Sequence, residues 1–173
     1  MTCCLEFGGD FMKITMGGNA VSLEGSMPKV GDTAPDFLVK DKDLNNVKLS
    51  DTKGLRLFVA VPSLDTPVCD TEVRRFYKET EGIRDLTVAV FSMDTPFAQA
   101  RWCAGAGISN LQVYSDFYNQ SFGKSYGIRI HEVGLLARAI FIVDAQNKIK
   151  YVQVVNEVTH EPNYDEVLQF LKH

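Results

Sequence analysis

The segment LRLFVAVP, Leu55 to Pro62, is the feature of the sequence that most restricts the fold. Its apolar residues follow one another almost without interruption, and a proline ends the run. A strand with one face in water would alternate polar and apolar residues, so this pattern predicts a strand buried on both faces. Such a strand needs helices packed against both sides of its sheet, and the rest of the chain must supply them.

The remaining sequence alternates predicted strands and helices. A Gly-Gly-Asn turn divides MKITMGGNAVSLEG into two short β-prone runs, which predicts an N-terminal β-hairpin. Beyond it we expect a helix to about Thr80, a buried strand over 86–94 and a helix from about Thr95 to Ala104 that stops at Gly105 and Gly107. A short strand over 111–115 and a helix over 119–126 follow. The chain then forms two strands joined by a polar turn over 137–155 and an amphipathic helix over 163–173. This order predicts an α/β fold with a central mixed sheet flanked by helices.

Composition and short motifs argue against several classes of function. The 173 residues carry a net charge of -4, which disfavours nucleic acid and anionic membrane surfaces as partners. No apolar run approaches the roughly 20 residues of a membrane span. The histidines are scattered and no metal-ligand or phosphate-binding motif is present, so we expect no metal and no cofactor. The N-terminus lacks the pattern of a secretory signal, which predicts a cytoplasmic protein.

The four cysteines, Cys3, Cys4, Cys69 and Cys103, are too few for a disulfide scaffold. In a reducing compartment, thiols that matter are more often catalytic or redox-active than structural. The cysteines are therefore the first candidates for chemistry.

Cys69 lies where a helix is predicted to begin. Proline favours the first position of a helix, so Pro67 makes Thr66 the N-cap and places Cys69 in the first turn. Unpaired backbone N–H groups and the helix dipole favour negative charge there, and the thiolate is the nucleophilic form of cysteine. Val73 and Phe76 share the helix face of Cys69, which predicts a half-sheltered thiol. The alternative is that Cys69 is a small buried apolar residue without chemistry.

The acidic neighbours of Cys69 oppose a thiolate. Asp70 and Glu72 are anions close to the sulfur and disfavour a second negative charge. A nearby cation is needed to offset them. Arg74 and Arg75 are candidates by position, but an arginine brought from elsewhere by the fold would serve better.

Pro62, Thr66 and Cys69 form the pattern P-x-x-x-T-x-x-C between a buried strand and a helix, which resembles the active-site signature of the peroxiredoxins. The resemblance covers the chain from about Met12 to the C-terminus. Three strings in the expected order are similar to one branch of that family, the bacterial thiol peroxidases, which are atypical two-cysteine peroxiredoxins: PSLDTPVCDTEVRRF, PFAQARWC and GLLARAIFIVD.

The resemblance implies a thioredoxin-like fold with an N-terminal hairpin, and a role for each matching residue. Cys69 matches the peroxidatic cysteine, which a hydroperoxide oxidises to a sulfenic acid. Thr66 matches the hydroxyl that hydrogen-bonds the sulfur and the peroxide, Arg138 the arginine that stabilises the thiolate, and Pro62 the proline that shields the site. Cys103 matches the resolving cysteine, which forms an intramolecular disulfide with Cys69. The resemblance further implies reduction by thioredoxin and a homodimer.

Without the resemblance, simpler interpretations of two of these residues stay open. Arg138 would be interpreted as a surface arginine at a strand edge, and Cys103 as a buried helix cysteine. The runner-up enzyme is a disulfide oxidoreductase of the thioredoxin type, which the lack of a C-x-x-C motif disfavours. A different class is a redox-regulated binding protein that uses a Cys69–Cys103 switch to signal to a partner.

Two further predictions concern the distance between Cys69 and Cys103 and the N-terminal residues 1–11. Cys103 lies at the far end of the helix that follows the next strand, on the order of 10 Å or more from Cys69. A disulfide needs Cα atoms within about 7 Å, so oxidation should unwind or shift a helix segment. Residues 1–11 have no counterpart in the family pattern. We expect them to be a poorly ordered extension before a single domain at 12–173, with Cys3 and Cys4 outside the chemistry. Two alternatives stay open: the segment is a natural extension, or Met12 is the usual start.

Overall fold

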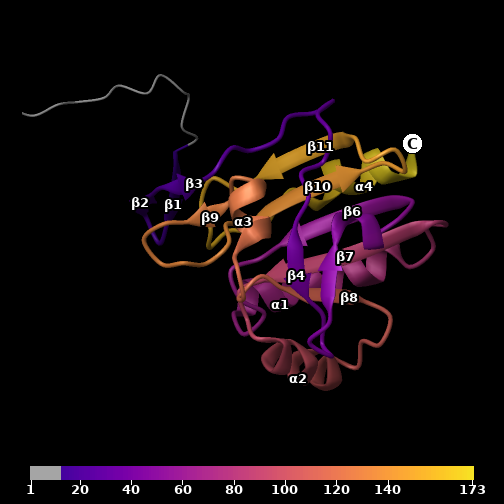
Figure 1. Cartoon of the computed structure of the whole chain (residues 1–173), viewed down its shortest axis with the longest axis horizontal. Coiled ribbons are helices and arrows are strands. Elements are labelled where there is room, and N and C mark those ends of the chain that lie inside the picture. Colours follow the sequence, from indigo (N-terminus) through magenta and orange to yellow (C-terminus); the bar gives the residue numbers. More distant parts are fainter. Residues whose placement is uncertain (1–12) are drawn as a thin grey trace, which may run out of the picture.

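The computed structural model describes residues 13–173 (Figure 1). The prediction for residues 1–11, including Cys3 and Cys4, lies outside these described residues.

A seven-stranded mixed sheet forms the centre of the fold, in the order β11-β10-β6-β7-β8-β4-β5. Its strands are β4 (Leu38–Lys40), β5 (Asn46–Lys48), β6 (Leu55–Ala60), β7 (Leu86–Ser92), β8 (Gln112–Ser115), β10 (Ala139–Val143) and β11 (Ile149–Val154). The strands β6, β7 and β8 run parallel, and the outer strands pair antiparallel. The doubly buried strand predicted from the sequence is β6, inside the sheet.

The alternate residues of β6 face two separate hydrophobic cores. Leu57 and Val59 belong to the core under the helices α1 and α4, and Phe58 and Ala60 belong to the core that contains α3. All four are fully buried. Burial on both faces explains why the run lacks the alternation of a half-exposed strand.

The helices cover both faces of the sheet. They are α1 (Pro67–Thr80), α2 (Pro96–Ala106), α3 (Ser121–Ser125) and α4 (Tyr164–Lys172), with a short 3₁₀ turn η1 (Leu49–Asp51). The helices α1, α2 and α4 contribute to the core of Leu57 and Val59, and α3 contributes to the opposite core. The helix α3 is shorter than the predicted 119–126. The helix α2 continues through Gly105 to Ala106, two residues past the predicted Ala104, and its C-cap is Gly107 with a positive φ of 67°. None of the described helices is long and apolar enough to cross a membrane.

The predicted N-terminal hairpin is present as β1 (Ile14–Met16) and β2 (Asn19–Val21). Its two-residue turn, Gly17-Gly18, has φ values of 59° and 82°, which glycine adopts without strain. A second two-stranded ribbon pairs β3 (Leu23–Glu24) with β9 (Arg129–Ile130), and Figure 1 shows the two ribbons next to each other.

Candidate active site

Cys69 lies in the first turn of α1, directly after the loop that follows β6. Pro67 is the first residue of the helix and Thr66 is its N-cap, with extended φ and ψ angles of -93° and 146°. The Thr66 hydroxyl accepts a hydrogen bond of 3.4 Å from the backbone N–H of Cys69. The local sequence thus places the sulfur at the positive end of the helix dipole.

The Cys69 side chain is more buried than the predicted half-sheltered thiol. Its exposed fraction is 0%, as is that of Glu72 three residues later on the same helix face, while Val73 is 1% exposed. The physical reason is that distant elements pack on this face, among them Arg138, whose guanidinium contacts both Cys69 and Glu72. Sequence spacing shows which face points inward but not what covers it.

Two polar groups contact the Cys69 sulfur. The Thr66 Oγ1 lies 2.7 Å from Sγ, and the Arg138 Nη1 lies 3.4 Å from it. The Thr66 Oγ1 is also 3.1 Å from the carbonyl oxygen of Ser63, and a hydroxyl has one proton to donate at a time. A negative charge on the sulfur directs that proton toward Cys69, because hydrogen bonds to charged acceptors are the stronger ones.

Arg138 lies immediately before β10 and is 2% exposed. Its Nε donates to the carbonyl oxygen of Val158 at 3.0 Å, and its Nη1 donates to Glu72 at 2.5 Å as well as approaching Cys69. A distant arginine thus reaches the sulfur. Arg74 and Arg75, the nearer candidates, instead pair with acidic residues one turn away on α1.

Glu72 is a buried carboxylate that does more than oppose a thiolate as a nearby anion. Burial raises the pKa of Glu72 to about 7, although the Arg138 guanidinium acts in the opposite direction. Its Oε2 pairs with Arg138, whereas its Oε1 has no partner among the described residues. Arg138 therefore serves two acceptors, the sulfur and this carboxylate. The spacing of three residues from Cys69 was a signal in the sequence for this shared face.

A second acidic residue that sequence reasoning missed is Asp94, just after β7. Its carboxylate accepts from the Ser63 hydroxyl at 2.7 Å and from the Leu64 N–H at 2.8 Å. These bonds fix the loop between Pro62, which is buried at the end of β6, and Thr66. The parallel pairing of β6 and β7 brings both loops to the same sheet edge, so no local sequence signal reports this contact.

Cys103 lies near the C-terminal end of α2 and is a half-buried free thiol. Burial raises the pKa of the Cys103 thiol, and Lys42 partly offsets this effect. The thiol lines a cavity of about 420 Å³, together with Ile108 and Tyr114. Cys69 is also a free thiol, so the structure shows the state without a Cys69–Cys103 disulfide.

The residues next to the two cysteines connect α1 to α2. The Trp102 Nε1 donates to Asp70 Oδ1 at 2.8 Å, and the Arg74 guanidinium lies 5.6 Å from the centre of the Trp102 ring. Arg74 also donates to the carbonyl oxygen of Ala106 at 3.4 Å. We call Asp70, Arg74 and Trp102 the interhelix link.

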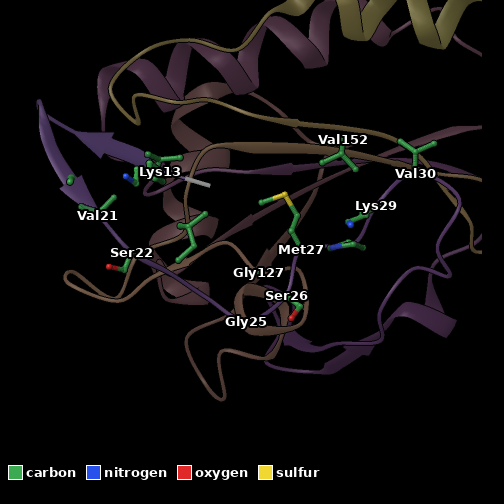
Figure 2. A pocket seen from close by; sticks show the side chains of 14 residues that line it. Lys13, Val21, Ser22, Gly25, Ser26, Met27, Lys29, Val30, Gly127 and Val152 are labelled. Carbon is green, nitrogen blue, oxygen red and sulfur yellow. The ribbon is translucent and has the colours of Figure 1, made fainter. Parts of the chain in front are cut away.

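A cavity larger than the one beside Cys103 lies away from this site. Its volume is about 1160 Å³, and none of the five predicted site residues lines it. Figure 2 shows Val21, Met27 and Val152 among the apolar side chains around it. Because the chemistry-bearing side chains lie elsewhere, cavity size does not identify the active site in this protein.

The geometry around Cys69 favours a nucleophilic thiolate. The fully buried sulfur has a hydroxyl donor, a permanent cation and a helix N-terminus around it. Within residues 13–173, no group of three or more histidine, cysteine or acidic side chains is placed to hold a metal ion. The donors around the Cys69 sulfur suit thiol chemistry.

Comparison with known proteins places the chain in a family. The Redoxin family profile matches residues 29–168. A thiol peroxidase of Clostridium acetobutylicum is 49% identical over 158 residues, which cover 91% of this chain and 96% of that protein. A thiol peroxidase of Bacillus subtilis is 42% identical over 161 residues, covering 92% and 96%.

Solved structures agree with this placement. A peroxiredoxin-like protein from Aquifex aeolicus superposes with a TM-score of 0.87 at 44% identity, covering 93% of this chain and 96% of that one. A thiol peroxidase from Chromobacterium violaceum has a TM-score of 0.86 at 23% identity and so shows the shared fold alone. The thioredoxin-like fold predicted from the sequence is confirmed. The chain belongs to the Redoxin family, in the group of the thiol peroxidases.

Proposed function

We propose that the chain is a thiol-dependent peroxidase in which Cys69 is the peroxidatic cysteine. The observation that carries this proposal is the position of one buried sulfur 2.7 Å from the Thr66 hydroxyl and 3.4 Å from the Arg138 guanidinium. Thiol peroxidase is also the name of its relatives at 41–49% identity.

The first step is attack by the Cys69 thiolate on the outer oxygen of a hydroperoxide. The S–O bond forms as the O–O bond breaks, which leaves a sulfenic acid and, after protonation of the departing oxygen, water or an alcohol. The departing oxygen becomes negative, and Arg138 and Thr66 are the donors that stabilise it. Because Cys69 has no exposed surface, the residues around it must move locally before a peroxide reaches the sulfur.

The second step is condensation of the Cys69 sulfenic acid with the Cys103 thiol. The products are an intramolecular disulfide and one water molecule. Thioredoxin then reduces the disulfide by thiol–disulfide exchange, which restores both thiols and oxidises thioredoxin. The two cysteines lie on different helices connected by the interhelix link, so disulfide formation requires part of α1 or α2 to shift.

The setting of the enzyme is also part of the proposal. We infer that residues 12–173 act as one domain, that the protein works in the cytoplasm, and that its substrates are hydrogen peroxide and organic hydroperoxides. A homodimer is supported by three exposed aromatic side chains, Phe97, Phe117 and Tyr118. They follow β7 and β8 at the sheet edge that also carries the loop of Cys69, where a second copy would cover them.

One experiment tests the peroxidase function. Reduced protein is mixed with stoichiometric cumene hydroperoxide while thiol loss and tryptophan fluorescence are followed. Trp102 is the only tryptophan and neighbours Cys103, so disulfide formation should change its emission. We expect oxidation far faster than that of free cysteine, and no such reaction in Cys69→Ser. A rate similar to that of free cysteine would contradict the proposal.

The matched variant Cys103→Ser tests the resolving role. It should still be oxidised once by peroxide but should not turn over with thioredoxin. Unimpaired turnover would reassign Cys103. If the unmodified protein is oxidised to the disulfide but does not turn over with thioredoxin, the redox-regulated binding protein becomes the better interpretation.

A further inference from the structure

The position of Arg138 depends on a segment after β11. The guanidinium donates through Nε to the carbonyl oxygen of Val158 at 3.0 Å, and it reaches Cys69 and Glu72 through Nη1. Arg138 is 2% exposed and Val158 is 1% exposed, so water does not replace this carbonyl as an acceptor. The direction of the Val158 carbonyl therefore helps to set where the guanidinium meets the sulfur.

The N-terminal hairpin holds Val158 from its other side. The backbone N–H of Val158 donates to the carbonyl oxygen of Thr15 in β1 at 2.9 Å. The N–H of Thr15 donates in turn to the carbonyl oxygen of Asn156 at 2.8 Å. The hairpin thus runs alongside residues 156–158 and fixes the peptide units that lead to Arg138.

The carboxylate of Glu157 joins the hairpin to the segment 156–159 by hydrogen bonds. It accepts from the Thr15 hydroxyl at 2.5 Å and from the backbone N–H groups of Gly17 and Gly18 at 2.8 and 3.1 Å. On its other side it accepts from the N–H and hydroxyl of Thr159 at 3.1 and 2.8 Å. The hydrogen bond from Thr15, followed by those from Thr159, holds the pKa of Glu157 well below its usual range.

These contacts lie on both sides of Val158 in the chain. The carboxylate belongs to the residue before Val158, and Thr159 is the residue after it, so both flanking residues are held by one group. Hydrogen bonds to a charged acceptor are about twice as strong as neutral ones, which makes this a firm attachment for an exposed hairpin. The Gly-Gly turn supplies two of the donors because its positive φ values turn both N–H groups toward the carboxylate.

We propose that Glu157 is a positioning residue for the peroxidase reaction, which acts on Cys69 through Val158 and Arg138. The proposal rests on the proposed function of Arg138 at the sulfur. It also gives the N-terminal hairpin a role in catalysis, because the hairpin supplies the donors that Glu157 needs and the carbonyl that holds Val158.

The test is Glu157→Gln in the full chain with Cys3, Cys4 and Cys103 replaced by serine, so that Cys69 is the only thiol. The amide keeps the shape of the side chain but loses the charge and faces some donors with its own N–H groups. We expect the reaction of Cys69 with peroxide to slow about tenfold, because misplacement of a catalytic group by a fraction of an ångström is costly. The thiolate absorbance at 240 nm and neutral pH should fall as well.

The matched control is Glu132→Gln in the same background. Glu132 accepts from the backbone N–H of Ser22 at 3.0 and 2.9 Å, and it thereby also ties the N-terminal region to a distant loop. Its partner does not contact Val158 or Arg138. The control should therefore keep both the peroxide rate and the thiolate absorbance of the unmodified background.

The outcomes separate positioning from simple stabilisation. If Glu157→Gln lowers thermal stability but leaves the peroxide rate and the absorbance unchanged, the proposal is wrong. If that variant does not fold, Thr15→Val decides, because it removes one hydrogen bond to Glu157 and keeps the backbone bond to Val158. An unchanged rate and absorbance in Thr15→Val would then overturn the proposal. If the unmodified background does not react with peroxide, the proposed function fails, and the absorbance difference still tests the positioning role.

Discussion

The surroundings of Cys69 and Cys103 differ in nearly every property that controls thiol chemistry. Cys69 lies in the first turn of its helix, is completely buried and has a hydroxyl and a guanidinium at its sulfur. Cys103 lies near the end of its helix, is half-buried, and has a thiol whose pKa is raised by burial. The helix dipole favours an anion at the first position and disfavours one at the second.

The difference supports the proposed division of tasks between the two sulfurs. A peroxidatic cysteine must be ionised before it meets the oxidant, and it must hold a fixed position relative to donors that stabilise the departing oxygen. A resolving cysteine attacks a sulfenic acid that is already reactive, and it has to travel to do so. The buried, hydrogen-bonded site suits the first task, and the half-exposed helix end suits the second.

Replacement of Arg138 should reduce the difference in reactivity between Cys69 and Cys103 more than any other single change. Arg138→Met removes the cation at the Cys69 sulfur and leaves the Glu72 carboxylate without its partner. We expect the rate of Cys69 oxidation by peroxide to fall about 10²- to 10³-fold, the usual cost of losing such a donor. Stopped-flow kinetics of the reduced protein measure this rate.

The same variant provides an internal control at the other cysteine. The rate at which Cys103 reacts with iodoacetamide should stay within about twofold of the unmodified rate, because Arg138 is not among its charged neighbours. Equal slowing at both cysteines would mean that Arg138 supports the fold as a whole rather than one sulfur.

Replacement of Glu72 tests how much a buried carboxylate beside Cys69 reduces the stability of the folded protein. The folded-state pKa of Glu72, about 7, lies above its ordinary value of 4.5. Between these values the folded protein keeps a proton that the unfolded chain releases, so stability falls as pH rises. The stabilisation that comes from protonated Glu72 in the folded protein is fully present below about pH 4.5 and is lost as pH rises through about 7. The loss approaches an upper bound of about 3 kcal/mol.

Glu72→Gln does not titrate and serves as the reference. Urea unfolding at several pH values between 4.5 and 8 should show that the unmodified protein loses stability relative to Glu72→Gln as pH rises. Other raised carboxyls, such as Asp116 with a pKa of about 6, cancel in this difference because both proteins contain them. Parallel curves would show that Glu72 stays ionised throughout the range.

Much of this site follows from the sequence, and the rest depends on tertiary packing. The Thr66-Pro67 cap and the start of α1 are local features, and the structure places them as predicted. The approach of Arg138 could be expected only through the family resemblance, because 69 residues separate it from Cys69. The loop contacts of Asp94 and the carbonyl of Val158 depend on backbone positions that no side-chain pattern reports.

The same limit applies to burial. Val73 and Phe76 indicate an inward helix face, but the complete burial of Cys69 and Glu72 depends on the segment that covers them. Sequence spacing predicted the doubly buried strand β6 well, because continuous apolar composition is itself the signal. A buried charged pair has no such compositional signal, so the sequence alone does not distinguish Glu72 from an ordinary anion near a helix start.

Replacement of Thr66 tests the contribution of one hydrogen bond to the Cys69 sulfur. Thr66→Val removes the hydroxyl at 2.7 Å from the sulfur and the N-cap of α1 while keeping the shape of the side chain. We expect the peroxide reaction of Cys69 to slow about tenfold, which corresponds to one charge-assisted hydrogen bond. Thr66→Ser keeps the hydroxyl and should retain most of the rate, and a serine variant as slow as the valine variant would contradict this role.

Replacement of Trp102 tests how easily Cys103 moves toward Cys69, and its expected effect on a rate is small. Trp102→Phe keeps an aromatic ring at the contact between the helices but loses the 2.8 Å hydrogen bond from Nε1 to Asp70. If the interhelix link holds the helices in their reduced arrangement, its loss should speed disulfide formation about threefold, as expected for one half-exposed hydrogen bond. Acid quenching and mass spectrometry of the disulfide measure this rate after a single addition of peroxide.

The control for the link is Arg101→Gln on the same helix. Arg101 also connects α2 to the active-site loop, through an ion pair of 3.4 Å with Asp65, but both side chains are largely exposed. Exposed ion pairs contribute little, so this variant should form the disulfide at the unmodified rate. Equal acceleration in both variants would mean that any loosening of α2 suffices. Acceleration in Trp102→Phe alone would show that the hydrogen bond between Trp102 and Asp70 restrains the movement of Cys103. The sites of Cys69 and Cys103 would then be coupled before any disulfide forms.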